Sequence, residues 1–290
     1  MRWPRFLDVP ENLIVELTNV CNLRCPVCPT IFGMTRARGF MKFEVFRDLL
    51  DNLHKHGLRP RLRFTLAGEP MLHKEIADFI DYAHRLQFRT DISTNATIYR
   101  KFNKQPSKMT VCLDGSTKEA HESYRVGSDF FQVEENIRKL VRENQGTQFT
   151  LQHLVTKWSE GQAEEVVKIA ELMGITRVKI KNIHTGHGFF KPKEEVRPNE
   201  DRFRRHFRRS RLCGAPYRHV LVYFNGACGL CCVDYNNCCN TKPDSLRGFV
   251  EKVRSREVKW RRVRAILKGW GICERCEMSG ALGMAKEVWL

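Results

Sequence analysis

The chain has 290 residues, and 42% of them are hydrophobic, which is enough for one large core with or without a small appendage. Lysine and arginine number 50 against 33 acidic residues, so the net charge is +17 at pH 7. No stretch of about 18 apolar residues is present, which excludes a membrane span by a helix. The segment 1–10 lacks the apolar run and the cleavage site of a signal peptide. We therefore expect a cytoplasmic protein.

Strand-like and helix-like segments alternate along the first two thirds of the chain. The hydrophobic patterns predict strands at 12–18, 61–66, 89–93, 109–113, 149–155 and 177–183. They predict helices at 42–54, 74–86, 130–143 and 162–173. Gly57 and Gly174 lie where the first and the last of these helices should end. Strands that are each followed by a crossover indicate an α/β fold with a parallel sheet. The predicted elements occupy only about 170 residues, which suits a partial (β/α)6 barrel better than a full eight-unit barrel.

The positive charge is concentrated in two segments, 202–211 and 252–268. Basic segments of this kind attract anions, such as a phosphorylated small molecule, a nucleotide, RNA or an acidic partner. A solvated basic surface that only keeps the protein soluble accounts for the same charge equally well. We expect an anionic substrate or partner, and nucleic acid is the less favoured form of that expectation.

Cysteines are numerous and clustered. Twelve of them in a chain with a sizeable core indicate metal binding in a reducing compartment rather than a disulfide framework. Cys21, Cys25 and Cys28 follow the first predicted strand with C-x3-C-x2-C spacing, so three thiolates can hold one iron–sulfur cluster. Three ligands on a four-iron cluster leave one iron open, which indicates a redox enzyme. A structural zinc site would need a fourth ligand, for which His54 and His56 are the local candidates.

This spacing resembles the radical S-adenosylmethionine (SAM) superfamily, and three later segments match motifs of that superfamily in order. Residues 67–70 (AGEP) resemble the GGEP motif that contacts the methionine amino group of SAM, with alanine at its first glycine. Residues 93–95 (STN) resemble the segment that contacts the ribose. Residues 112–115 (CLDG), with His121 and Arg125 after them, resemble the SxDG…HxxxR stretch. In relatives its serine and arginine lie near the SAM carboxylate.

Two positions depart from the superfamily pattern. Cys112 stands in the place of the serine, so neighbouring Ser116 is the candidate to replace that contact, and Val27 stands where many members carry an aromatic residue near adenine. The residues that the resemblance implies for SAM binding are Gly68, Glu69, Pro70, Ser93, Thr94, Asn95, Ser116 and Arg125.

The resemblance also implies the chemistry. SAM would chelate the open iron of a [4Fe–4S] cluster, and one electron would cleave it to methionine and a 5′-deoxyadenosyl radical, which abstracts hydrogen from an unactivated carbon. The cofactor performs the difficult step and the protein positions it. An external one-electron reductant of the flavodoxin or ferredoxin type is implied as a partner. The radical SAM partial barrel is assigned to residues 1–183.

The last quarter of the chain has a different composition. Residues 184–212 are rich in Gly, Pro and charge and are interpreted as a linker or lid, whereas residues 213–290 hold eight of the 12 cysteines. A strand is predicted at 219–224, followed by a hairpin turn at Asn225 and Gly226. The segment resembles the twitch domain, the shortened form of the SPASM extension, a small cysteine-rich α+β domain. The resemblance implies an auxiliary [4Fe–4S] cluster on Cys213, Cys231, Cys273 and Cys276, and an all-cysteine zinc ribbon is the alternative.

The size and layout resemble dehydrogenases of the scyllo-inosamine type. We therefore expect a radical SAM oxidoreductase, a dehydrogenase or an epimerase, that acts on a small anionic metabolite with the auxiliary cluster as electron acceptor. Candidates for the catalytic base are His153, His184, His187 and Arg125. Cys232 and Cys238 are candidates for a thiol that returns a hydrogen atom in an epimerase.

Three alternatives stay open. The first is radical SAM modification of a ribosomal peptide, in which leader recognition would need another protein because only 20 residues precede Cys21. The second is RNA modification, supported only by the net charge and testable by salt dependence. The third is a zinc-stabilised nucleic-acid-binding protein without enzyme activity, which colour and iron content would distinguish.

Overall fold

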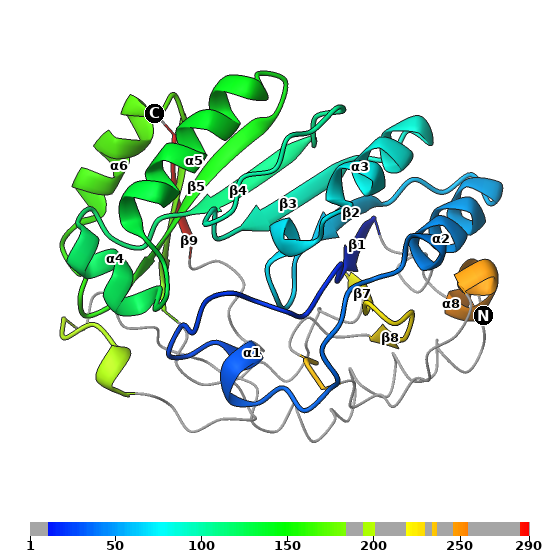
Figure 1. The fold of residues 1–290 in the computed structure, drawn as a ribbon, viewed down its shortest axis with the longest axis horizontal. Helices are drawn as coiled ribbons and strands as arrows, with labels where there is room; N and C mark the ends of the chain where they lie inside the picture. The colour runs from blue at the N-terminus through cyan, green and yellow to red at the C-terminus, as the bar shows by residue number, and fades with distance from the viewer. Residues whose placement is uncertain are drawn as a thin grey trace, which may run out of the picture.

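The computed structural model describes residues 11–183, 194–200, 219–229, 234–236, 246–254 and 285–289. Its strands form one sheet in the order β8-β7-β1-β2-β3-β4-β5-β6-β9, and the run from β7 through β6 is parallel throughout (Figure 1). The strands are β1 (Asn12–Val15), β2 (Arg61–Phe64), β3 (Thr90–Thr94), β4 (Lys108–Cys112), β5 (Gln148–Val155), β6 (Arg177–Asn182), β7 (His219–Val222), β8 (Cys228–Gly229) and β9 (Ala285–Trp289). The expected α/β fold with a parallel sheet is confirmed.

Helices connect most of the parallel strands. The α-helices are α1 (Pro29–Phe32), α2 (Phe43–Lys55), α3 (Ile76–Arg85), α4 (Lys118–Tyr124), α5 (Phe130–Glu143), α6 (Ala163–Leu172) and α8 (Phe249–Arg254). Short 3-10 helices lie at η2 (Pro70–Leu72), η3 (Glu194–Val196) and η5 (Leu246–Gly248). In the part of the chain that the structure describes, no helix is long and apolar enough to cross a membrane.

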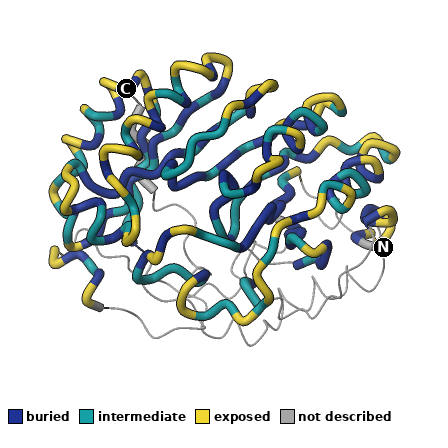
Figure 2. The backbone as a smooth tube through the Cα atoms, in the orientation of Figure 1, coloured by how far each residue is buried: buried dark blue, intermediate teal, exposed yellow. Residues whose placement is uncertain are grey.

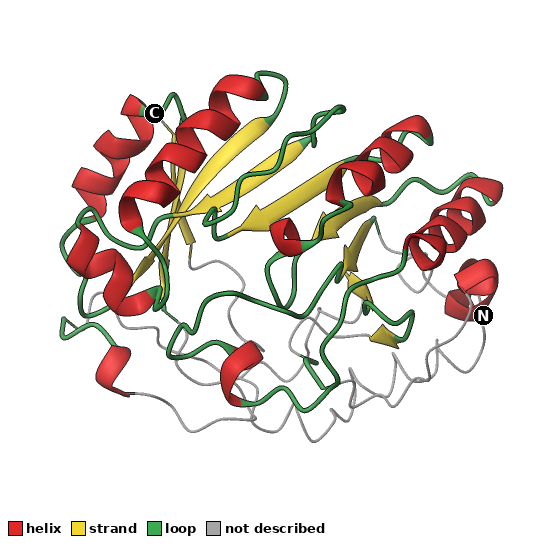
Figure 3. Cartoon of the chain, in the orientation of Figure 1, coloured by secondary structure: helices red, strands yellow, loops and turns green. Residues whose placement is uncertain are grey.

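The main core lies between the sheet and the helices α2, α3, α5 and α6, which line one side of the sheet (Figure 3). Alternate residues of β5 are buried against these helices, and Leu151 packs in one cluster with Val166 and Ala170 of α6. Figure 2 shows this burial as dark segments along the strands and the inner sides of the helices. The sheet therefore has a helix-covered face and an opposite inner face, on which the intervening residues of each strand lie.

Local sequence signals account for most of the element boundaries. The helix predicted at 130–143 is observed as α5 with those bounds, and Asp129 caps it by accepting a hydrogen bond from the Gln132 backbone N–H. Gly57 and Gly174 have φ angles of 68° and 75°, the left-handed conformation expected after a helix end. The short helices α1 and α4 were not predicted, because each has too few apolar residues for a periodic pattern.

The C-terminal strand β7 joins the sheet beside β1. Its residues pair in parallel register with those of β1, from Asn12 opposite His219 to Val15 opposite Val222. The expected strand at 219–224 is therefore present but two residues shorter, and the turn that follows has Gly226 at φ 82° and leads into β8. A strand from the cysteine-rich segment thus extends the same sheet as the strands of 1–183.

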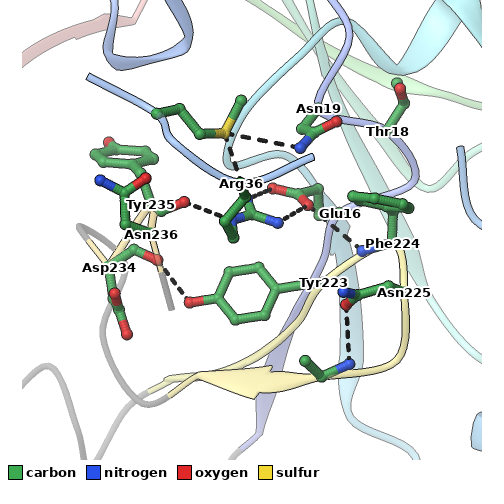
Figure 4. A network of polar contacts seen from close by, with 12 residues as sticks. Glu16, Thr18, Asn19, Arg36, Tyr223, Phe224, Asn225, Asp234, Tyr235 and Asn236 are labelled. Atoms are coloured by element: carbon green, nitrogen blue, oxygen red, sulfur yellow. Dashed lines mark hydrogen bonds and ion pairs between the residues drawn. The ribbon is translucent and has the colours of Figure 1, made fainter. Parts of the chain in front are cut away.

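A buried ion pair ties the end of β1 to the chain that follows Cys28. The two terminal nitrogens of Arg36 donate hydrogen bonds to the Glu16 carboxylate at 2.9 and 2.7 Å, and the guanidinium lies over the Tyr223 ring with its carbon 4.3 Å from the ring centroid (Figure 4). Arg36 Nε also donates to the backbone oxygen of Tyr235 at 2.5 Å. The pair is deeply buried, with side-chain exposures of 10% for Arg36 and 0% for Glu16.

The same network includes the segment after β8. Tyr223 donates its hydroxyl to the backbone oxygen of Asp234 at 2.5 Å. The Asn236 amide donates to the backbone oxygen of Gly33 at 2.7 Å, and its oxygen accepts from the Thr35 backbone N–H at 2.8 Å. The two Asn236 hydrogen bonds join residues about two hundred positions apart in the chain, and they hold the loop after the first cysteine motif against the C-terminal part of the sheet.

Removing the charge of Glu16 should destabilise the fold. Glu16→Gln leaves a buried guanidinium without its carboxylate, and we expect the free energy of unfolding to fall by about 3 kcal/mol. The matched control is Arg61→Gln, which breaks a pair of side chains with 26% and 19% exposure and should cost no more than about 1 kcal/mol. Urea denaturation of both variants measures the difference, and equal losses would show that burial of the Glu16 pair does not control stability.

Candidate functional site

The predicted motif residues come together at the carboxyl edge of the parallel sheet. The cysteine motif follows β1, residues 67–70 follow β2, residues 93–95 end β3, and residues 112–115 end β4. Because the carboxyl ends of parallel strands lie at one edge, these four loops are neighbours in space. Direct contacts confirm it: the Glu69 backbone N–H donates to the Val20 oxygen at 2.8 Å, and the Asn95 amide lies 3.9 Å from the Cys21 sulfur.

The three thiols of the cysteine motif belong to one apolar cluster. Cys25 is buried, and Cys21 and Cys28 are half-buried beside it. The other members of this cluster come from the loops and strands around the motif: Leu23, Val27, Tyr124, Leu154, Trp158, Ile183 and Val196. Burial raises the pKa of the Cys21 and Cys25 thiols to about 11. Both are therefore neutral at pH 7 without a bound cation, and a metal centre would supply the charge that stabilises their thiolates.

The donor set suits an iron–sulfur cluster better than a single ion. Within the described residues, no group of three or more His, Cys, Asp or Glu side chains could hold one metal ion. A four-iron cluster accepts each thiolate on a different iron, so its ligands need not converge on one point. N–H groups surround the sulfurs, since the Leu23 backbone donates to Cys21 Sγ at 3.5 Å and Arg125 lies 3.9 Å from Cys25 Sγ. Hydrogen bonds of this kind tune such clusters.

Glu69 connects the second and third loops through its buried carboxylate. Oε1 accepts hydrogen bonds from the Thr94 hydroxyl at 2.7 Å and the Met71 backbone N–H at 3.0 Å, and Oε2 accepts from the Asn95 backbone N–H at 2.7 Å. Burial raises the pKa of Glu69, and these three donors oppose that shift. Asn95 extends the connection, because its amide also donates to Asn22 Oδ1 at 3.2 Å within the cysteine motif.

Arg125 and Asp114 form a second buried ion pair next to the cysteines. Arg125 Nε donates to Asp114 Oδ2 at 2.5 Å, and Asp114 Oδ1 accepts from the Leu154 backbone N–H at 2.7 Å. The Asp114 carboxylate raises the pKa of Arg125 further, so the guanidinium stays charged. His121 lies behind the pair, where burial lowers its pKa to about 4 and its neutral ring accepts a hydrogen bond from the Asp114 backbone N–H at 3.2 Å.

Three other predicted SAM-binding residues lie at the same edge with structural contacts. Pro70 begins the 3-10 helix η2 and is buried. Ser93 is half-buried and shares the inner face of the sheet with its register neighbour Thr110. The Ser116 backbone N–H donates to Gln162 Oε1 at 2.9 Å, which ties the loop after β4 to the residue that precedes α6.

Two candidates from the sequence lie on opposite faces of the sheet. Cys112 is buried at the end of β4 and faces Gln152, whose amide lies 3.8 Å from the sulfur. His153 is fully buried on the face that β5 turns toward the helices, with Leu151 and Val155. Its Nδ1 bonds the Leu113 oxygen at 3.1 Å, and burial lowers its pKa. Strand alternation thus places His153, one of the candidates for the catalytic base, on the helix-facing side of β5.

Several predicted residues lie outside the described part of the chain. They are the auxiliary cysteines Cys213, Cys231, Cys273 and Cys276, the thiol candidates Cys232 and Cys238, and the lid histidines His184 and His187.

Sequence reasoning missed Gln152 and Lys181, which lie next to this site. Lys181 Nζ donates to Gln152 Oε1 at 2.5 Å between neighbouring strands. The alternation of the two strands could have identified these residues. Both Gln152 and Lys181 alternate with apolar residues in predicted strands, and this pattern assigns them to the inner face of the sheet.

Gly68 is required by the close approach of two loops. Its φ is 70°, and a Cβ there would lie 2.5 Å from the Thr18 oxygen and 2.7 Å from the Val20 oxygen. We expect Gly68→Ala to lower the free energy of unfolding by about 3 kcal/mol, because the cysteine loop must move. Gly57→Ala is the matched control, with φ 68° and nothing within 4 Å, and should cost about 1 kcal/mol. Equal costs in thermal or urea unfolding would show that only backbone strain matters.

Comparison with known proteins gives a family match and several distant relatives. The model of the radical SAM superfamily matches residues 15–170, more than half of the chain. A PqqA peptide cyclase from Granulibacter bethesdensis is 24% identical over 183 residues, which cover 61% of this chain and 48% of that protein. The chain thus spans about half the length of such curated relatives.

Solved structures share the fold. Streptococcus suis SuiB bound to precursor peptide SuiA superposes with a TM-score of 0.63 at 17% identity, over 93% of this chain and 71% of that chain. BtrN in complex with AdoMet and 2-DOIA superposes with a TM-score of 0.56 at 14% identity, over 93% of both chains. The radical SAM superfamily uses a [4Fe–4S] cluster together with SAM. The family model covers the strands and loops that bring the three thiols, the buried Glu69 and Arg125 to the carboxyl edge of the parallel sheet, and its match over more than half of the chain shows that this chain belongs to the radical SAM superfamily.

Proposed function

We propose that this protein cleaves SAM reductively and removes a hydrogen atom from a carbon of its substrate. The observation that carries the proposal is the convergence of the cysteine motif, the Glu69 loop and Arg125 at one edge of the sheet. Family membership supports an enzyme over the zinc-stabilised nucleic-acid-binding alternative.

Cys21, Cys25 and Cys28 would hold the cluster, and the loops that Glu69 joins would hold SAM. When bound, the cluster and SAM supply a carbon radical that abstracts hydrogen from an unactivated position. The side chains around the thiols keep water away, since Leu23 and Tyr124 are buried in the same cluster. Arg125 keeps a positive charge beside Cys25, where it would face the carboxylate of SAM.

For the overall reaction we favour oxidation of a small metabolite. An oxidation that begins with loss of a hydrogen atom must also release one electron and one proton. Cys213, Cys231, Cys273 and Cys276 would hold the acceptor of that electron, and an external one-electron reductant would serve the first cluster. An epimerisation instead returns a hydrogen atom, for which Cys232 and Cys238 are the thiols proposed.

Modification of a ribosomal peptide is the second candidate. The relative named as a PqqA peptide cyclase favours it. The two candidates differ in substrate size, so incubation with peptide libraries and with polyol or amine metabolites, followed by mass spectrometry, separates them. A product two mass units lighter than a metabolite supports oxidation, and a modified peptide supports the second candidate.

Iron analysis tests the cluster assignment. After anaerobic reconstitution we expect about eight irons per chain in the wild type and about four in the variant with Cys21→Ala, Cys25→Ala and Cys28→Ala. With dithionite and SAM, 5′-deoxyadenosine should form only in the wild type. Cys112→Ala is the control and should keep full iron content. Zinc in place of iron in the wild-type protein, without SAM cleavage, would contradict the proposal. About four irons per wild-type chain, with SAM cleavage intact, would support the cluster on Cys21, Cys25 and Cys28 but not the auxiliary cluster.

Arg125→Lys tests the predicted SAM contact. Lysine keeps the charge but loses the fork geometry that binds a carboxylate through two hydrogen bonds. We expect iron content to stay unchanged and the Kd for SAM to rise about tenfold or more. Equilibrium dialysis with labelled SAM measures the effect, and an unchanged Kd would remove Arg125 from the SAM site.

A further inference from the structure

The turn after β3 holds an asparagine amide in a closed ring of hydrogen bonds beside the cysteine motif. Thr97 donates its hydroxyl to Asn95 Oδ1 at 2.7 Å, and the Asn95 amide donates to Asn22 Oδ1 at 3.2 Å. The Asn22 amide closes the ring by donating to Thr97 Oγ1 at 2.8 Å. Each of the three side chains gives one of these hydrogen bonds and receives another, so the ring fixes all three relative to one another.

Both ends of the Asn95 amide are used within the protein. Oδ1 accepts from the Thr97 hydroxyl and also from the Thr97 backbone N–H at 3.0 Å. A backbone N–H can only donate, so this contact fixes the oxygen on that side of the amide and the nitrogen on the other. Nδ2 has two hydrogens, and its two partners are Asn22 Oδ1 and Cys21 Sγ, the latter at 3.9 Å. The ring therefore directs one amide hydrogen at a thiol of the cysteine motif.

The turn that builds this ring has a strained backbone. Ala96 has a φ of 58° although it is not glycine, and it is fully buried. This left-handed conformation is unfavourable for alanine, and two contacts hold it. Asn136 of α5 donates to the Ala96 backbone oxygen at 2.9 Å, and the Ala96 N–H donates to Thr94 Oγ1 at 3.0 Å. The turn brings Thr97 back onto Asn95, which an extended strand would not do.

The contact with the sulfur is shielded from water. Asn95 is 6% exposed, and Cys21 is half-buried. The Leu23 backbone N–H meets the same sulfur at 3.5 Å, so two N–H groups face one thiol. Reduction adds negative charge to an iron–sulfur cluster and its thiolates. Donors to a thiolate ligand therefore stabilise the reduced state more than the oxidised state, and they raise the reduction potential.

We propose that Asn95, oriented by Asn22 and Thr97, donates a hydrogen bond to the Cys21 thiolate and so raises the reduction potential of the cluster on the cysteine motif. The inference rests on the proposed function, because it needs a cluster on Cys21, Cys25 and Cys28. A higher potential makes the transfer of one electron from an external reductant to this cluster more favourable. Asn22 and Thr97 are positioning residues, since they act through Asn95.

The reduction potential tests the proposal without SAM cleavage. Anaerobically reconstituted protein without SAM is titrated with dithionite in the presence of mediators, and the EPR signal of the reduced cluster gives its midpoint potential. The variant with Cys21→Ala, Cys25→Ala and Cys28→Ala shows the signal of any other cluster, which is subtracted. Asn95→Leu replaces the donor by an apolar side chain of the same branching. It should lower the equilibrium constant for one-electron reduction about tenfold, which is about 59 mV.

Asn144→Leu is the matched control. Asn144 is 3% exposed and its amide donates to the Leu140 backbone oxygen at 2.9 Å. It lies between the end of α5 and the start of β5, at the edge of the sheet opposite the cysteine motif. The same substitution there should leave the potential unchanged. Equal shifts in the two leucine variants would show a general effect of a lost buried amide and would overturn the proposal.

Variants of Thr97 test whether orientation of the amide matters. Thr97→Val removes the hydroxyl and keeps the shape, and it should lower the potential by less than Asn95→Leu does, because the amide remains with one contact fewer. Thr97→Ser keeps the hydroxyl and should keep the wild-type potential. Thr97→Val added to Asn95→Leu should give no further shift, since Thr97 acts through Asn95. Additive shifts would overturn the proposed role of the ring.

Two further outcomes separate failure of the inference from failure of the proposed function. An unchanged potential in Asn95→Leu, together with weaker SAM binding in equilibrium dialysis, would assign the amide to the ribose and overturn the inference alone. A wild-type protein without any iron–sulfur signal that depends on the three cysteines would overturn the proposed function, and the inference with it.

Discussion

The parallel hydrogen-bond ladder from β1 to β6 is the constraint on which the rest of the structure depends. It aligns the carboxyl ends of the strands, so loops that are separated in sequence become neighbours at one edge. The loop after β2 then reaches the loop after β1 closely enough for the Glu69 N–H to bond the Val20 oxygen. Glycine is needed at position 68 for the same reason, since a side chain would meet backbone oxygens.

Buried charges make this edge rigid. Glu16 and Asp114 are fully buried, and each is held by an arginine, while the buried Glu69 is held by two backbone N–H groups and a hydroxyl. A buried carboxylate is stable only with such partners, so each pair fixes the relative position of two or more segments. The polar residues on the inner face of β5 and β6, by contrast, are half-buried.

The parallel strands and their helices could be predicted from local pattern. Residues 130–143 have apolar side chains at helical spacing, and the same face is buried in α5. The strand at 149–155 alternates in the sequence and in the structure. Helix α4 escaped prediction because its seven residues bury only Ala120, His121 and Tyr124, a pattern too short to recognise. The pairing of β7 with β1 also escaped, since a strand carries no local signal for its partner.

The sequence by itself determined the spacing of the three thiols and the order of the motif loops, because both depend on short segments and on strands that follow one another. It also implied the SAM residues, through resemblance rather than through geometry. Only the tertiary structure decided that Glu69 joins two loops, that Arg36 binds Glu16 while lying over the Tyr223 ring, that His153 lies on the helix-facing side of β5, and that Lys181 contacts Gln152. The physical reason is that each of these contacts joins groups on different strands or loops, and the packing of the sheet, not the local chain, sets their distance.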